Sequence, residues 1–262
     1  RLLWGSAEPL SCIPWRQPAE LPLAEASRYL FNRGAALLWA RRMLAEGVEG
    51  KEPRRRFVLV AIQKARLAWG DALLLAHGRY TVLYRDRERR LEEVGAPAGL
   101  EFVAGAYRDA LRFKLRPDFE GYTSTDLSAW LEETAARHEA VWRWVEARRG
   151  VGSGQEADFW SRHFAAPAPR LRPEDARIRW PERLFNLALN LARVRPRSAR
   201  FLFERPEERL ARVLPLLLFA DAEDAVLWPA VSALLGAGGR GAVRREALVS
   251  RFLRIWHPGP PF

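Results

Sequence analysis

The stretch FVLVAIQKARLAWGDALLLAHGRY, residues 57 to 80, decides the fold because its apolar residues recur with the period of an α-helix. At about 100° per residue, the large apolar side chains fall within one arc, and Lys64 and Asp71 lie inside that arc about 20° apart. Packing of this face against other helices would bury both charges. We therefore expect either a satisfied structural network around these two residues or the edge of a ligand site.

Partners for the two charges have to come from other helices, because Lys64 and Asp71 are two turns and about 10.5 Å apart along the helix axis. Arg33 lies at the edge of the apolar face of the preceding predicted helix, residues 23 to 46, and is the expected partner of Asp71. The residues that follow add groups able to bind phosphate or to stack on a base: His77, Arg79, Tyr80, Tyr84 and Arg85. These residues are the candidate members of one ligand site or network.

Helical periodicity extends over most of the chain, and no run of alternating apolar and polar residues competes with it. An antiparallel bundle is expected over residues 23–149, with helices at about 23–46, 54–77, 81–94, 99–115 and 126–148. A second helical group is expected over residues 182–262, with helices at about 182–194, 206–219, 222–235 and 242–256. The predicted fold class is therefore all-α.

Two segments interrupt this pattern. Residues 1–22 contain four prolines and are expected to form an extended connector, in which one short N-terminal strand is an option. Residues 150–181 combine the glycine-rich run GVGSGQ with several prolines. They are predicted as a linker or a long exposed loop.

The net charge of +11 comes from forty arginines and only three lysines, against 32 acidic residues. Together with eleven Trp residues, this composition suits an RNA-binding surface, because guanidinium groups bind phosphate and stack on rings. The arginines often adjoin acids, as in RDRERRLEE at 85–93, which favours solvated helix faces instead. Nucleic acid is therefore an alternative partner. The few Asn, Gln, Cys and Met residues also suit a heat-tolerant protein.

Composition excludes several classes of protein. The single cysteine, Cys12, cannot form an intramolecular disulfide, so a reducing cytoplasm is the expected location. The longest apolar region, about residues 213–235, contains three acids and two prolines, so no membrane partner is expected. Arg1 is not an ordinary product of initiator-methionine removal, and we expect natural sequence upstream of it.

The chain carries no complete catalytic or metal-binding motif. His138 lies at the centre of the apolar stripe of the helix predicted at 126–148 and is expected to be hydrogen-bonded in the core. The four histidines lack cysteines or carboxylates at zinc-ligand spacing, and GVGSG at 150–154 lacks the lysine and the strand of a phosphate-binding loop. We assign no catalytic residue, metal ligand or cofactor to this segment itself.

Two stretches, EASRYLFNRGAALL at 25–38 and QKARLAWGDALLLAHGRY at 63–80, resemble the helical region that follows the catalytic domain in prokaryotic nucleotidyltransferase-like proteins of the polymerase-β superfamily. RLLWGSAEPLSCIP at 1–14 resembles the segment that joins the catalytic sheet to the helices there. The resemblance covers roughly the first 115 residues. Such helical regions are similar to HEPN bundles, which pair with nucleotidyltransferase domains in cis or in trans.

The resemblance implies a helical accessory domain that helps to shape a nucleotide or acceptor site. In the family, a Gly-Ser turn and paired aspartates hold Mg²⁺ for nucleotidyl transfer from an NTP. Gly5 and Ser6 match the turn, but no Asp-x-Asp follows them, so the catalytic residues are expected upstream or on another chain. Two alternatives stay open: an HEPN-type RNA-binding or RNA-cleaving module, for which Arg251 and His257 match the Arg–His spacing, and a helical protein-interaction scaffold.

Overall fold

The computed structural model describes residues 17–48, 51–166, 171–173, 180–194, 202–219, 227–236 and 244–257. Within these ranges every regular element is a helix, which confirms the all-α fold. The α-helices are α2 (Ala24–Ala45), α3 (Glu52–Ala76), α4 (Tyr84–Val94), α5 (Phe102–Leu115), α6 (Leu127–Arg148), α7 (Phe159–Ala165), α8 (Trp180–Leu189), α9 (Pro206–Phe219), α10 (Trp228–Leu235) and α11 (Arg245–Trp256). Short turns of other helix types are η1 (Pro18–Glu20), η2 (Glu120–Tyr122) and η3 (Asn190–Val194).

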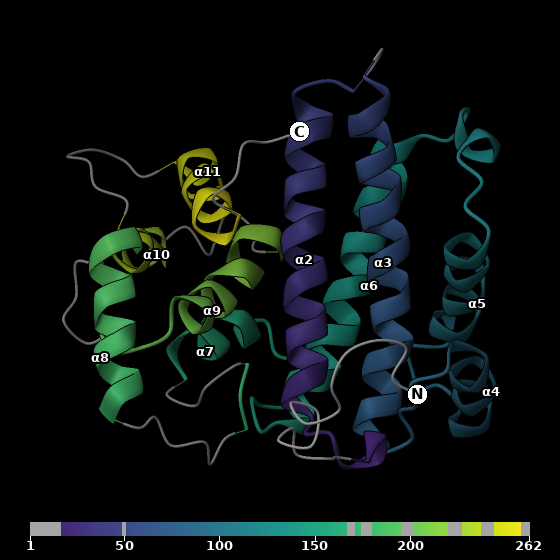
Figure 1. Cartoon of the computed structure of the whole chain (residues 1–262), viewed down its shortest axis with the longest axis horizontal. Coiled ribbons are helices and arrows are strands. Elements are labelled where there is room, and N and C mark those ends of the chain that lie inside the picture. Colours follow the sequence, from purple (N-terminus) through teal and green to yellow (C-terminus); the bar gives the residue numbers. More distant parts are fainter. Residues whose placement is uncertain are drawn as a thin grey trace, which may run out of the picture.

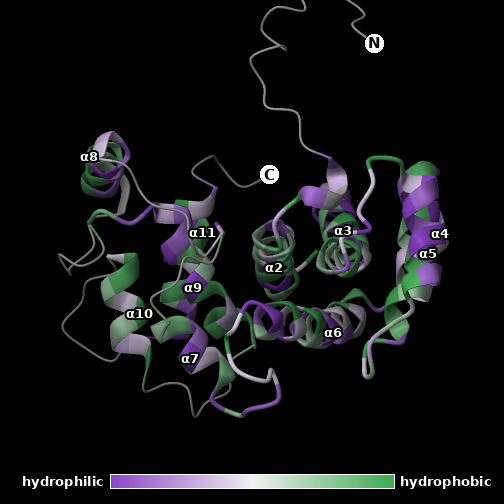
Figure 2. Cartoon of the chain, turned by 90° about the horizontal axis from the view of Figure 1, so that it is seen from below, coloured by the Kyte–Doolittle hydropathy of each residue, from purple (hydrophilic) through white to green (hydrophobic). Residues whose placement is uncertain are grey.

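Helices α2, α3 and α6 form the centre of the molecule. Figure 1 shows α2 and α3 side by side, and the short connection between them makes them antiparallel. Helix α6 lies across one side of this pair and contacts both members (Figure 2). Helices α4 and α5 pack beyond α3, so that α3 is flanked by α2 on one side and by α5 on the other. The predicted bundle thus forms, and its helices begin and end within three residues of the predicted positions.

The second helical group packs on the opposite flank of α2. Helix α9 is its central element and contacts α2, α6, α7, α10 and α11. Figure 1 shows α8 at the outer edge of this group, far from α4 and α5. One hydrophobic core runs through both groups, because buried side chains of α2 and α6 meet those of α7 and α9. The two predicted groups are therefore packed together rather than connected by a free linker.

Close approach of helices occurs at Gly34, in the middle of α2. A Cβ atom at this position would lie 3.1 Å from Trp142, 3.3 Å from Leu214 and 3.4 Å from His138. A side chain here would force these neighbours to shift by a few tenths of an ångström, so glycine suits the close contact of α6 and α9 with α2. His138 itself is buried as predicted: the Trp69 indole N–H donates to its Nδ1 at 2.9 Å, and its Nε2 lies 3.0 Å from the Leu30 carbonyl oxygen.

The structure differs from the predictions in the segment between the two helical groups. The segment predicted as a linker, 150–181, contains α7, whose Phe159 and Trp160 are buried because they pack against the core. Asp126 caps α6 by accepting from the backbone N–H groups of Ser128 and Ala129 at 2.9 and 3.1 Å. The predicted N-terminal strand, and all of the connector before residue 17, lie outside the described residues.

None of the helices in the described ranges is both long enough and apolar enough to cross a lipid bilayer.

Candidate functional site

Asp71 is buried, as the sequence predicted, and only 6% of the residue is exposed. One guanidinium nitrogen of Arg87, on α4, donates to both carboxylate oxygens at 3.1 Å, and the Tyr107 hydroxyl of α5 donates at 3.3 Å. Burial raises the pKa of Asp71 above its ordinary value, and the contacts with Arg87 and Tyr107 act in the opposite direction. Arg87 therefore occupies the role of ion-pair partner that was predicted for Arg33.

Arg87 is held on all sides by the segment that leads into α4. Its guanidinium carbon lies 4.4 Å from the ring centres of both Tyr80 and Tyr84. Its remaining N–H groups donate to the backbone carbonyl oxygens of Thr81 and Val82. With all three guanidinium nitrogens donating and two rings against the cation, this buried ion pair is a satisfied structural network.

Three further cations surround this pair: Arg33 on α2, Lys64 on α3 and Lys114 on α5. We call them the cation cluster. Arg33 is half-buried, and both lysines are exposed, so the predicted burial of Lys64 is wrong. Lys114 Nζ donates to the Tyr84 hydroxyl at 2.6 Å. Neither Arg33 nor Lys64 forms a side-chain hydrogen bond or an ion pair with any residue in the described part of the chain.

The charges of the cation cluster act on one another. Partial burial lowers the pKa of Lys64, and the positive charges of Arg33 and Lys114 lower it further. Burial also lowers the pKa of Arg33, and Tyr29, Asp71 and Tyr84 act in the opposite direction, Asp71 being the one carboxylate among them. Because Arg87 already neutralises Asp71, the three cluster cations represent excess positive charge. Perturbed pKa values and uncompensated charge gathered in one place are typical of a ligand site.

Five of the eight predicted site residues therefore meet: Arg33, Lys64, Asp71, Tyr80 and Tyr84. The other three lie apart from them. His77 stacks on Trp144 of α6 at 6.0 Å, and Arg79 forms an ion pair with Glu93 at 3.0 Å. Arg85 is exposed and forms no ion pair with a described residue.

The prediction missed four residues that complete the site: Tyr29, Arg87, Tyr107 and Lys114. Arg87 lies in the charged run 85–93, which was interpreted as a solvated helix face, although its position between Tyr84 and Leu91 on one helix face distinguishes it from the other arginines. Lys114 also carries a signal, because it is one of only three lysines in a chain of forty arginines.

The arrangement favours binding of an anion over catalysis or metal binding. The cluster offers one arginine fork and two lysine point charges to a ligand, beside the half-buried rings of Tyr29 and Tyr84. It contains no carboxylate that could bind a cation, because Arg87 and Tyr107 already engage Asp71. In the described ranges, His, Cys, Asp and Glu side chains nowhere form a group able to hold a metal ion.

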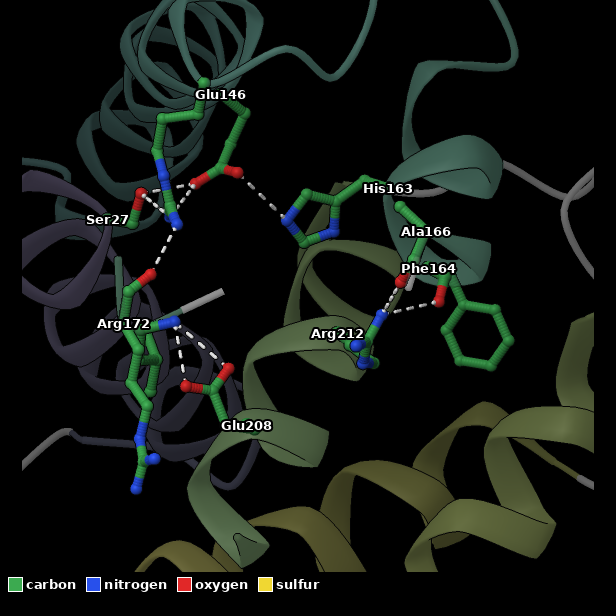
Figure 3. Close-up of polar contacts among 10 residues, drawn as sticks. Ser27, Glu146, His163, Phe164, Ala166, Arg172, Glu208 and Arg212 are labelled. Atoms are coloured by element: carbon green, nitrogen blue, oxygen red, sulfur yellow. Dashed lines mark hydrogen bonds and ion pairs between the residues drawn. The ribbon is translucent and has the colours of Figure 1, made fainter. Parts of the chain in front are cut away.

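A second polar network, between α2, α6 and α7, is sealed from solvent. The Ser27 hydroxyl donates to Glu146 at 2.5 Å, and Arg149 donates to the Ser27 oxygen at 2.7 Å. His163 Nε2 lies 3.6 Å from the other oxygen of Glu146. Figure 3 shows Glu146 between Ser27 and His163, with Arg172 and Glu208 of the neighbouring segments below. Glu146 and His163 have no exposed surface, so this network joins helices and does not bind substrate.

Helix α8 and the η3 turn that continues it present a different kind of surface, because their polar side faces inward. Asn186 and Asn190 are buried and donate to backbone carbonyl oxygens of residues 202–204. The outward face carries large apolar side chains that are more than half exposed: Trp180, Leu184, Phe185 and Leu191. An ordinary surface helix has the reverse arrangement. Exposed apolar faces of this kind are typical of interaction surfaces.

No protein-family model matches the chain, and the searches of curated proteins and of solved structures give no match either. The proposed function below therefore rests on the cation cluster, its charges and its surroundings.

Proposed function

We propose that the cation cluster binds the phosphate groups of a nucleotide or a nucleic acid. The observation that supports this is the excess of positive charge contributed by three helices at one place, with Arg33 and Lys64 lacking any acidic partner in the described residues. Like charges held together oppose folding, and a bound anion that neutralises them would remove this cost. A phosphate carries enough charge, and enough acceptor oxygens, to contact all three cations.

In this proposal the chain acts as a helical accessory domain of a nucleotidyltransferase-like protein. The catalytic domain, with its Mg²⁺ and NTP, would lie on the same polypeptide or on a partner, and the cluster would help to shape its nucleotide or acceptor site. This part of the proposal rests on the sequence resemblance of residues 25–38 and 63–80. The cytoplasmic location expected from the single cysteine belongs to the same proposal.

The test uses calorimetric titration with ATP and three lysine variants. We expect Lys64→Gln and Lys114→Gln each to weaken binding about tenfold, because each removes a charge-assisted contact with phosphate. Lys51→Gln is the matched control, since Lys51 is the third lysine of the chain, is exposed and lies at the start of α3. Equal losses for all three variants, or none, would count against the cation cluster as the phosphate site.

Salt dependence gives an independent check. Three cations that release counterions from a single strand predict a slope of about 2 in a plot of log affinity against log salt. A broad phosphate-binding face would give a steeper slope. We expect the shallow one, because many surface arginines are paired with acids, such as Arg108 with Glu88 and Glu92.

A second candidate function, protein assembly, is favoured by the outward apolar face of α8. The occupant that we propose is a second copy of the chain, because the same face on that copy offers apolar surface of matching chemistry in a two-fold arrangement. Light scattering would give the molar mass across a range of concentrations. We expect a dimer that Leu184→Glu converts to a monomer, and a monomer at every concentration would rule this out.

The RNA-cleaving alternative has less support. His257 packs against Trp39, with ring centres 5.1 Å apart, and against Trp256. Arg251 donates to the Leu235 carbonyl oxygen at 3.0 Å. His257 is thus engaged in ring contacts and Arg251 in a hydrogen bond to the backbone.

A further inference from the structure

An open cavity of about 840 Å³ lies at the C-terminal end of α5, between α3, η2 and α6. Its lining combines aromatic rings with arginines and two aspartates, and the residues used below are Arg66, Phe113, Leu115, Arg116, Tyr122 and Trp130. A volume of this size suits a group as large as a nucleobase with its sugar.

The aromatic wall of the cavity is firmly held. Tyr122 and Trp130 stack with ring centres 5.4 Å apart and planes 9° apart, and Phe113 meets Tyr122 edge-on at 5.9 Å. Gln63 donates to the Tyr122 hydroxyl at 3.2 Å. These contacts fix the rings before any ligand arrives, which lowers the entropy that a stacking ligand would lose on binding.

Arginines complete the cavity. The Arg66 guanidinium lies 5.6 Å from the ring centre of Trp130 and forms an ion pair with Asp109 at 3.2 Å. Arg116 is exposed, and its guanidinium forms no hydrogen bond or ion pair with a described residue. A guanidinium plane over a tryptophan marks a place where another flat, electron-poor group can stack.

The cavity and one member of the cation cluster lie at the same end of α5. Lys114 belongs to the cluster, whereas the next two residues, Leu115 and Arg116, line the cavity. Successive side chains of a helix point about 100° apart, so the two sites face different directions. A ligand that reaches both has to be long enough to pass around the exposed end of α5, where Leu115 is 60% exposed.

We propose that this cavity binds an unpaired base, and that the ligand of the cation cluster is therefore a single-stranded oligonucleotide. Its phosphates contact Arg33, Lys64 and Lys114, and one base enters the cavity, where it takes the position over Trp130 that Arg66 now occupies. This inference rests on the proposed phosphate-binding function and adds the class of ligand. A duplex is excluded by the same geometry, because its bases are stacked and paired and cannot enter a cavity.

The experiment measures fluorescence anisotropy of a labelled RNA strand of about eight nucleotides, a length within the usual site size of single-strand-binding domains. Competitors are the same strand annealed to its complement, inorganic tripolyphosphate as a polyanion without a base, and a phosphorylated peptide of equal charge. We expect the single strand to bind at least about tenfold more tightly than the duplex or tripolyphosphate, because stacking of one base contributes a factor of this size.

The decisive variant is Trp130→Leu. We expect it to weaken binding of the strand about 5- to 150-fold, which corresponds to the loss of one stacked base, and to leave tripolyphosphate binding unchanged. Trp130→Phe should restore part of the loss. Trp144→Leu is the matched control, because Trp144 is also a half-buried tryptophan of α6 with an arginine, Arg148, over its ring at 4.3 Å.

The two proposals fail in different ways. If Lys64→Gln and Lys114→Gln change neither strand nor tripolyphosphate binding, the phosphate site itself is wrong. If they weaken both ligands but Trp130→Leu acts no more than Trp144→Leu, the phosphate site stands and the base cavity is overturned. Tighter binding of the duplex or of the phosphorylated peptide than of the single strand would also overturn it.

Discussion

Two buried carboxylates, Glu146 and Asp71, occupy opposite kinds of surroundings. Around Glu146 every polar neighbour is itself enclosed: Arg149 has 2% and His163 has 1% of its side chain exposed. Around Asp71 the two direct partners, Arg87 and Tyr107, are also enclosed, and beyond them lies the exposed, positively charged surface of Lys64. The first network ends inside the protein, and the second continues to solvent.

The difference shows what a buried charge can and cannot indicate. A buried acid with matched partners reports that helices are joined there, and it is found as readily in a sealed interface as beside a ligand site. Charge in excess of those partners is the observation that distinguishes the Asp71 region. The following predictions test whether the two regions differ as described, from the largest expected effect to the smallest.

The largest effect is expected for Glu146→Ala. The substitution leaves Arg149 and His163 enclosed without their acid, and it removes the acceptor of the Ser27 hydroxyl. Loss of one member of a buried ion pair costs about 3 to 5 kcal/mol of unfolding free energy. Urea unfolding would measure it, and phosphate binding per folded molecule should be unchanged.

Acid should destabilise the protein through His138, which is buried between α2, α3 and α6. Burial lowers the pKa of this imidazole to about 4, so it is neutral in the folded protein, whereas in the unfolded chain it has its ordinary pKa of 6.5. As pH falls below 6.5 the unfolded chain takes up a proton that the folded protein rejects, so the contribution is complete above pH 6.5 and is lost by about pH 4. The loss is about 3 kcal/mol.

Unfolding free energies of the wild type and of His138→Gln, measured across this pH range, would check the assignment. Glutamine can accept from Trp69 and donate to the Leu30 carbonyl oxygen without titrating. The variant should therefore show a flatter pH dependence. Parallel curves for the two proteins would show that His138 is not the titrating group.

A smaller loss, about 1 to 3 kcal/mol, is expected for Asp71→Asn. The amide still accepts a hydrogen bond, and Arg87 keeps its contacts with the Thr81 carbonyl oxygen and two tyrosine rings. The same change removes the one negative charge of the region, so binding of ATP should become tighter. Weaker binding would show that Asp71 contributes to the site in some way other than by its charge.

The smallest effect on stability is expected for Lys64→Gln, within about 0.5 kcal/mol and with either no change or a slight rise in melting temperature. Lys64 is exposed, has no partner in the described residues and is repelled by Arg33 and Lys114. A melting temperature that falls as far as that of Asp71→Asn would indicate a hidden structural role and would weaken the comparison.

The sequence predicts the helices well because their periodicity is strong, and it predicts the burial of Asp71 for the same reason. It fails at Lys64, which has nearly the same angular position on α3. A lysine can extend its long apolar stem along the helix and place its ammonium group in water, whereas the short side chain of an aspartate cannot. Angle alone therefore does not separate the two residues.

Two other features were not predicted. Arg87 shares one face of α4 with Tyr84 and Leu91, which indicates that it points inward, but only the fold shows that it meets Asp71. For α8 the periodicity reveals an apolar face, but the usual assumption that this face is buried gives the wrong orientation. In both cases the helix itself was predicted, and what was missed is which of its faces packs against the rest of the protein and on what.

Contacts of α2 also bear on the order in which the chain acquires its structure during synthesis. Ser27 contacts Glu146 119 positions later, Arg41 contacts Leu218 177 positions later, and Arg42 contacts Ser250 208 positions later. The α2–α3 hairpin can form early from local contacts, but one flank of α2 has to wait until nearly all of the chain to residue 257 has left the ribosome. For that interval the hairpin exposes an apolar strip, and a nascent chain in this state is a natural substrate for chaperones.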